Sequence, residues 1–219
     1  MKSFAPLLTL CLGLLAAPLG LAAEREDTPP NRPTVQKRFG TKEGHVTMHL
    51  VGVTHVRNDL YNTLGAGLDL GYYFNEQLGA ELRLVWLYTR LSGAGDSIRE
   101  RAGLTPDARA QNYLTTAGLR YSFGYGKILA FDTFVVHFDP QITLHAGTAF
   151  AGQRVLPTVL TGLSLLNHFK WGIQVKLDLN LTAQMERRDR GWVPSFGFAP
   201  FLGLGWSYGG LAAVPEAGP

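Results

Sequence analysis

The segment Trp171–Met185 alternates strictly between two kinds of residue. Every odd position from Trp171 to Met185 is apolar, and every even position is Gly, Gln, Lys, Asp, Asn or Thr. A β-strand points successive side chains to opposite faces, so a strand with this sequence has one apolar and one polar face. A helix would scatter both kinds of residue around its circumference. The segment therefore predicts a long β-strand.

The same period of two recurs in seven other segments between residues 43 and 208. It is clear in 64–74, 78–88, 113–123, 138–150 and 196–208, and weaker in 44–53 and 157–168. Soluble strands usually have about five or six residues, whereas a membrane-crossing strand needs about 9–11. Most of these segments reach the longer length. We therefore expect an all-β fold, an eight-stranded antiparallel transmembrane β-barrel of the outer membrane, over residues 43–208.

The composition agrees with a barrel and excludes several other classes. Charged residues are 17% and hydrophobic residues 46% of the chain, with 26 Gly, and an average soluble domain carries about 25% charge. This low charge argues against a disordered chain or a coiled coil. The formal net charge is only +3, and basic residues cluster only at Arg187, Arg188 and Arg190, so we expect no nucleic-acid partner.

Residues 1–23 have the pattern of a secretory signal peptide. Lys2 precedes an apolar run from Phe4 to Leu19, and the small residues Gly20 and Ala22 follow. The alternative is a membrane anchor, which would need about 20 apolar residues. We expect 24–42 to be a flexible periplasmic tail and 209–219 a C-terminal tail, so that both ends of the mature chain lie in the periplasm.

The connections between the predicted strands alternate in length. The 75–77 and 167–170 connections are short, whereas 54–62, 91–111 and 185–194 are longer and polar. Outer-membrane barrels have short periplasmic turns and long external loops. The 124–136 connection should be periplasmic, yet it is long and apolar, and it could be an interfacial helix or a hairpin. We expect contact with a partner through Tyr125, Lys127, Phe131 and Phe134.

The apolar face of each predicted strand ends in aromatic residues. Aromatic belts mark the two interfaces of a bilayer. The alternative is a soluble barrel with an apolar interior, such as a lipocalin, whose outward face would be rich in Lys and Glu. Here the polar face carries mostly Gly, Thr, Ser and Gln, which favours the membrane. The expected interface residues are Tyr72, Phe74, Trp86, Tyr88, Tyr113, Tyr121, Phe123, Trp171, Phe196, Phe198, Trp206 and Tyr208.

The polar face of the strands should then line the interior. Eight strands leave room only for side chains, and buried charges are tolerated when they are paired and hydrogen-bonded. We therefore expect no wide pore, and we expect a polar network that fills the interior. Its expected members are Asp69, Glu81, Arg83, Arg120, Asp139, His145, Lys176 and Asp178.

The sequence gives only weak evidence for a catalytic or metal-binding site. His145 has no Ser two residues further on the same face, and His55 shares an expected outer loop with Asp59 but with no Ser. His45 and His49 lie four residues apart, which is about 13 Å along a strand and too far for one metal ion. We therefore expect no catalytic residues, no metal and no cofactor. The 186–190 run could contact lipopolysaccharide phosphate or could be a solvated loop tip.

Two stretches resemble the outer-membrane β-barrel domain of myxobacteria and related deltaproteobacteria. Residues 51–82 are similar to it through Asn58, Asp59, Tyr72, Asn75, Glu76, Leu78, Gly79 and Glu81. Residues 125–150 are similar through Tyr125, Gly126, Lys127, Phe138, Asp139 and Gly147, although Ala149 replaces a second Gly. Members of that family include envelope proteins of gliding-motility complexes. The resemblance implies a structural barrel within a complex, and it carries over no catalytic residues.

The sequence thus leaves three functional hypotheses. The first is a non-enzymatic scaffold of an envelope complex, such as one for gliding motility, in contact with outer-membrane lipid, lipopolysaccharide and other envelope proteins. The second is a lipid A-modifying enzyme, and the third is a narrow channel.

Overall fold

The computed structural model describes residues 41–57, 60–104, 110–130, 134–169, 172–188 and 191–208. The predicted signal peptide, nearly all of the predicted tail and the C-terminal tail lie outside these residues. Eight antiparallel strands form a closed barrel, because β4 pairs with β6 as well as with β3. They are β1 (Val46–Arg57), β2 (Tyr61–Tyr73), β3 (Leu78–Leu91), β4 (Tyr113–Ser122), β6 (Phe134–Ala151), β7 (Arg154–His168), β8 (Ile173–Arg188) and β9 (Gly191–Tyr208). The predicted eight-stranded antiparallel barrel is confirmed.

The strand register fixes the geometry of the barrel. Following the paired residues around the barrel from Val46 leads back to β1 at Val56, ten residues further along the strand. With about 3.3 Å per residue and about 4.8 Å between strands, this stagger corresponds to a tilt of about 40° from the barrel axis. Each residue along a strand therefore rises about 2.5 Å along the axis.

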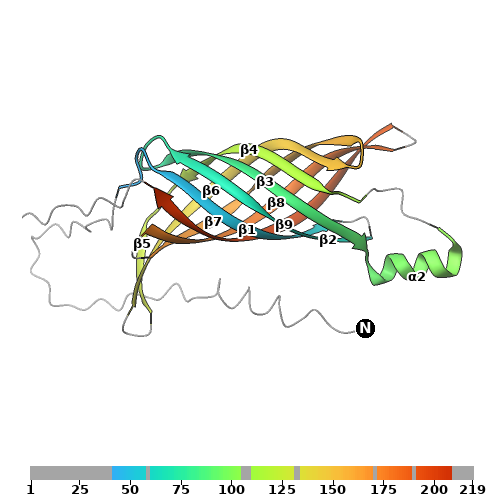
Figure 1. Cartoon of the computed structure of the whole chain (residues 1–219), viewed down its shortest axis with the longest axis horizontal. Coiled ribbons are helices and arrows are strands. Elements are labelled where there is room, and N and C mark those ends of the chain that lie inside the picture. The colour runs from blue at the N-terminus through green and yellow to red at the C-terminus, as the bar shows by residue number, and fades with distance from the viewer. Residues whose placement is uncertain are drawn as a thin grey trace, which may run out of the picture. The chain divides into compact units, whose positions relative to one another are not determined.

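The two ends of the barrel differ. We call the end where β1 begins the turn rim, because it carries the tight β2–β3 turn at residues 74–77. We call the other end the loop rim, because it carries the long β3–β4 connection and its helix α2 (Gly93–Ala102). Figure 1 shows α2 beyond one end of the barrel and the β5 hairpin beyond the other. The side chain of Ser92 caps α2 by accepting a hydrogen bond from the backbone N–H of Gly95.

The faces of the strands follow the predicted alternation. On β8, Lys176 and Asp178 are buried in the interior, whereas Leu181 on the opposite face is 62% exposed. On β1, buried His49 is followed by Leu50, which is 59% exposed. The apolar face therefore points outward and the polar face inward. This orientation is the reverse of that in a soluble barrel with an apolar interior.

Two of the predicted outer loops are mostly strand. β1 and β2 extend through most of the expected 54–62 loop, and β8 and β9 extend through most of the expected 185–194 loop. The expectation of long irregular loops there was wrong. Ladder hydrogen bonds need no apolar face, so pairing continues past the point where the apolar pattern ends. The 91–111 connection remains long, as expected.

The apolar 124–136 connection contains a ninth strand. β5 (Gly126–Ala130) pairs with the first residues of β6, from Phe134 to Phe138, and forms a hairpin at the turn rim. Of the two expected alternatives, helix or hairpin, the structure shows the hairpin. Within the described residues β5 pairs only with β6, so its other edge has no described strand beside it.

Candidate functional site

Six ionic side chains meet in the interior of the barrel. Arg83 donates from Nε and Nη2 to the two oxygens of Asp69, at 3.0 and 2.9 Å. The same Nη2 lies 2.8 Å from Glu81 Oε1 and 2.5 Å from Asp178 Oδ2. Asp69 and Arg83 are direct partners in the β2–β3 register, which explains how the strand pairing brings them together. The six are Asp69, Glu81, Arg83, Arg120, Lys176 and Asp178, all buried.

Lys176 reaches the same carboxylates from the other side of the interior. Its Nζ lies 2.5 Å from Asp69 Oδ2 and 2.9 Å from Glu81 Oε1. It also lies 3.3 Å from Asp178 Oδ2, and Arg120 pairs with the second oxygen of Glu81. Three acids thus face three bases. This balance lets the group remain ionised away from water, because each charge has partners of the opposite sign.

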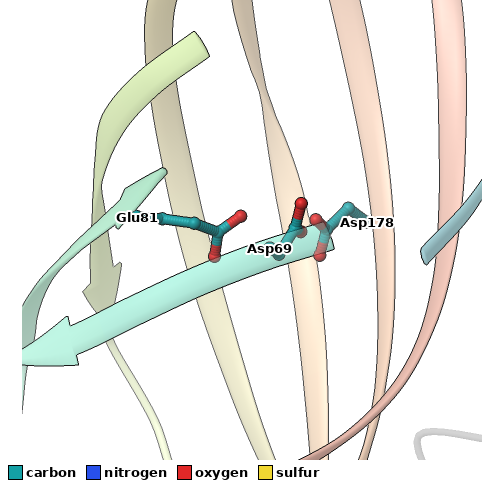
Figure 2. Close-up of side chains that lie close together, drawn as sticks. All are labelled: Asp69, Glu81 and Asp178. Carbon is teal, nitrogen blue, oxygen red and sulfur yellow. The ribbon is translucent and has the colours of Figure 1, made fainter. Parts of the chain in front are cut away.

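The three carboxylates also have the spacing of a cation site. Oxygens of Asp69, Glu81 and Asp178 lie within 4.8 Å of one another, and Figure 2 shows the three side chains close together in the barrel interior. However, the ammonium of Lys176 and the guanidinium of Arg83 contact all three carboxylates. The protein's own cations therefore occupy the positions that a metal ion would take. In this structure the arrangement is an ion network.

A second cluster lies at the turn rim. Lys42 Nζ is 2.5 Å from Asp139 Oδ2 and 2.8 Å from Ser122 Oγ. The Gln141 side-chain amide donates to Asp139 at 2.9 Å and to the hydroxyl of Tyr73 at 2.8 Å. The expected network residue Asp139 therefore belongs to this cluster and not to the six-residue network.

The two clusters are connected through Tyr73. Its hydroxyl accepts a hydrogen bond from Arg120 Nη1 at 3.1 Å, in addition to the bond from Gln141. Sequence reasoning missed Lys42, because it precedes the first strand and was assigned to a tail. It also missed Tyr73, which follows the outward aromatic Tyr72 in the sequence and therefore points to the opposite, inward face of the strand.

The interior is not polar throughout, which corrects the expectation. An apolar layer lies on the loop-rim side of the ion network, since Val51 and Val53 follow His49 on β1, and Val85 follows Arg83 on β3. The layer is buried and contiguous, and it consists of Val51, Val53, Val85, Leu87, Leu114, Ala149, Ala151, Leu156, Leu160, Ala199 and Phe201. The Arg83 guanidinium lies 3.9 Å from the centre of the Phe201 ring, so the layer packs directly on the network.

Polar residues return beyond the apolar layer, at the loop rim. His55 Nε2 lies 3.0 Å from the hydroxyl of Thr182, and both residues are buried. Arg57 pairs with Glu186 at 3.4 Å. Sequence reasoning had placed His55 in an outer loop, but it is an inward residue of β1; Asp59 lies outside the described residues. The expected network residue His145 is fully buried, with Nε2 3.9 Å from Glu81 Oε1.

The predicted interface aromatics lie on the outward face. All of them within the described residues are exposed, and Trp171 is outside those residues. The turn-rim ring is Tyr72, Phe74, Tyr121, Phe123, Trp206 and Tyr208, and the loop-rim ring is Trp86, Tyr88, Tyr113, Phe196 and Phe198. The register places the first ring near the level of Val46 and the second near that of Val56. Ten residues of a strand tilted by about 40° separate the rings by about 25 Å.

The expected partner-contact residues lie at the β5 hairpin. The hydroxyl of Tyr125 is 2.6 Å from Nδ1 of His137, and the two rings stack with centroids 6.0 Å apart. Lys127 is exposed on β5. Phe131 lies outside the described residues, and for Phe134 the structure describes only the backbone pairing with Ala130.

Comparison with known proteins gives few matches. No family model matches the chain, and no curated protein matches it. A solved chain from the de novo design of transmembrane β-barrels is similar over 77% of this chain and 98% of its own length, with 11% sequence identity and a TM-score of 0.39. Among the described residues, no helix is long and apolar enough to cross a membrane.

Proposed function

We propose that the chain is an integral outer-membrane β-barrel that acts as a non-enzymatic scaffold in an envelope complex. The observation that carries the proposal is the outward surface. In the described part of the chain, 36 large hydrophobic residues are exposed, whereas the apolar patches of soluble monomers rarely exceed a few hundred Å². Exposure of this apolar surface to water would be unfavourable, whereas lipid acyl chains would solvate it.

The height of the outward apolar band supports the same proposal. Leucines fill the band between the aromatic rings, for example Leu50, Leu144, Leu163 and Leu202, each more than half exposed. The rings lie about 25 Å apart, which is the height of the apolar band of outer-membrane barrels. In the proposed orientation the turn rim faces the periplasm and the loop rim faces outward, because the loop rim carries the long β3–β4 connection with α2, and long connections are typical of the external end.

The filled interior favours a scaffold over a channel. Five acidic and five basic side chains are enclosed, and each takes part in an ion pair; they are Asp69, Glu81, Asp139, Asp178 and Glu186 with Lys42, Arg57, Arg83, Arg120 and Lys176. The apolar layer beside them adds a region that ions would cross only at a high cost. Both features indicate an interior that is filled by side chains and closed to ions.

The β5 hairpin is the proposed contact with another envelope protein. Ile128 is 50% exposed and Val135 is 52% exposed, on two faces of the hairpin. A two-stranded hairpin alone is marginally stable, and an apolar edge strand tends to pair with another chain. An extended apolar segment of the partner could add by β-augmentation to the edge of β5 that has no described strand beside it. A motility complex is one setting for this contact.

Photocrosslinking in intact envelopes tests the scaffold. A crosslinking amino acid replaces Ile128 on β5 in one variant and Ile98 on α2 in the matched control; both side chains are exposed. We expect one discrete crosslinked species from position 128, lost when V135D is added, and none from position 98. Absence of a crosslink at 128 would contradict the scaffold. Release of a fatty acid from lipopolysaccharide by the purified barrel would instead favour the enzyme.

A further inference from the structure

Exposed cations gather at the loop rim. Arg90 follows Trp86 and Tyr88 on the outward face of β3, and Arg187 follows Met185 on the outward face of β8. Arg154 is exposed at the first position of β7; it has the strand phase of the inward residues Leu156 and Thr158, but it lies at the end of the barrel and its guanidinium reaches the backbone of Arg187 on β8. Among the described residues, no Lys or Arg faces outward between the two aromatic rings. Within the described barrel strands, the outward-facing cations Arg90 and Arg187 therefore both lie at the loop rim.

Two of these arginines are held next to each other. Arg154 donates from Nη1 to the backbone carbonyl oxygen of Arg187 at 2.8 Å, which keeps its guanidinium at the end of β8. A guanidinium has five N–H donors, so most of them remain for a ligand. Trp192 is the register partner of Arg187 and is 55% exposed. The ends of β7, β8 and β9 thus present two guanidinium groups beside an indole.

These two guanidinium groups are not neutralised by the described part of the chain, where neither forms an ion pair with a carboxylate. Of the other arginines near the loop rim, Arg57 pairs with Glu186 in the interior and Arg99 pairs with Asp96 on α2, whereas Arg90 lies over the ring of Tyr88, 5.5 Å from its centre. Because no described carboxylate pairs with them, Arg154 and Arg187 are cations available to an external anion.

The level of the pair corresponds to lipid headgroups. At about 2.5 Å of rise per residue, Arg154 and Arg187 lie about 5–10 Å beyond the loop-rim aromatics. Cationic side chains beyond an aromatic belt reach the phosphates of the bilayer. Guanidinium groups bind phosphate through paired hydrogen bonds.

We infer that Arg154 and Arg187 form a binding site for the phosphates of a phosphorylated glycolipid of the lipid A type in the outer leaflet. The inference rests on the proposed membrane function and its orientation. Two guanidinium groups at one rim position match a headgroup that carries more than one phosphate. Trp192 lies beside the headgroup, and Met185 and Phe196 on the outward face below contact its acyl chains.

The test measures lipid that stays bound to the full chain. The protein is inserted into phosphatidylcholine bilayers containing bis-phosphorylated lipid A, and retained lipid is counted by native mass spectrometry. The variant is R154Q/R187Q. The matched control is R99Q/R101Q on exposed α2, which removes the same charge at another place beyond the loop rim. We expect the variant to retain lipid A at least about tenfold more weakly, with the control unchanged.

Further arms identify the ligand. Wild type should not retain fully dephosphorylated lipid A. Equal retention of phosphatidylglycerol, or displacement of lipid A by inorganic phosphate, would overturn the glycolipid assignment. Equal retention by R154Q/R187Q and wild type would overturn the site. Protease protection of the barrel is measured first: a chain that does not insert contradicts the proposed function, whereas an inserted chain without selective retention contradicts only this inference.

Discussion

Replacing Arg83 with Met should strongly destabilise the barrel. The substitution keeps an unbranched apolar side chain of comparable length but removes the guanidinium that contacts Asp69, Glu81 and Asp178. Three buried carboxylates would then face only Lys176 and Arg120. Removing one partner of a buried ion pair typically costs about 3–5 kcal/mol, because the remaining charge has no compensation. We expect a loss of this size in the free energy of unfolding.

A second substitution should recover part of that loss. In R83M/D178N the interior again holds equal numbers of acids and bases, so the double variant should be more stable than the sum of the single effects predicts. A coupling free energy of about 2 kcal/mol or more is expected for such contacting charges. The measurement is urea-induced unfolding of the barrel in phosphatidylcholine vesicles, followed by tryptophan fluorescence.

The matched control is Arg99→Met on α2. Arg99 pairs with Asp96 at 3.1 Å, but the two side chains are 53% and 45% exposed, and an exposed pair contributes about 0–1 kcal/mol. The control should therefore unfold almost as wild type does. If R83M also unfolds within about 1 kcal/mol of wild type, the interior network does not stabilise the fold as argued.

Three further predictions concern ion conduction, the contact of Lys42 with Asp139, and the close approach of strands at Gly147. In planar bilayers the wild-type protein should give no stepwise current, and regular conductance steps would show that the apolar layer containing Leu160 and Phe201 is not a seal. Lys42→Gln should lower the unfolding free energy by about 1–3 kcal/mol, since it leaves buried Asp139 without its cation; thermal unfolding beside an R99Q control measures it, and an unchanged midpoint would contradict the contact. Gly147→Val should prevent folding in a heat-shift electrophoresis assay, because a Cβ there would lie 2.1 Å from the carbonyl oxygen of Thr115, whereas Gly93→Ala, with nothing within 4 Å, should fold normally.

The alternation in the sequence predicted the barrel, because a period of two residues identifies a strand and also separates the residues of its two faces. Trp171–Met185 is the clearest case, since nearly all of it is β8 and its even positions from Gln174 to Gln184 are buried. For 124–136 the sequence left a helix and a hairpin open, because this mostly apolar run carries no alternation of period two. Such a run is compatible with a helix or a strand, and only pairing with β6 decides between them.

The members of the ion network were predictable, but their partners were not. An inward charged residue can be recognised from its place in the alternation, as with Asp69 or Lys176. Which charges meet depends on the register and on the stagger around the barrel, which brings Lys176 of β8 to Asp69 of β2. Inward apolar residues were also missed, because in β1 Val51 and Val53 are as apolar as the outward Leu50. The family resemblance remains a prediction.

The most direct test of the account is the environment of the outward leucines. A spin label replaces Leu202, which is 62% exposed on β9, in the full chain reconstituted into phosphatidylcholine vesicles, and a second label replaces Arg187 at the loop rim. The account predicts that the label at 202 collides with oxygen dissolved in the acyl chains and is shielded from a water-soluble nickel complex, while the label at 187 shows the opposite preference. Free access of the nickel complex to position 202 would contradict the proposal that this surface faces lipid.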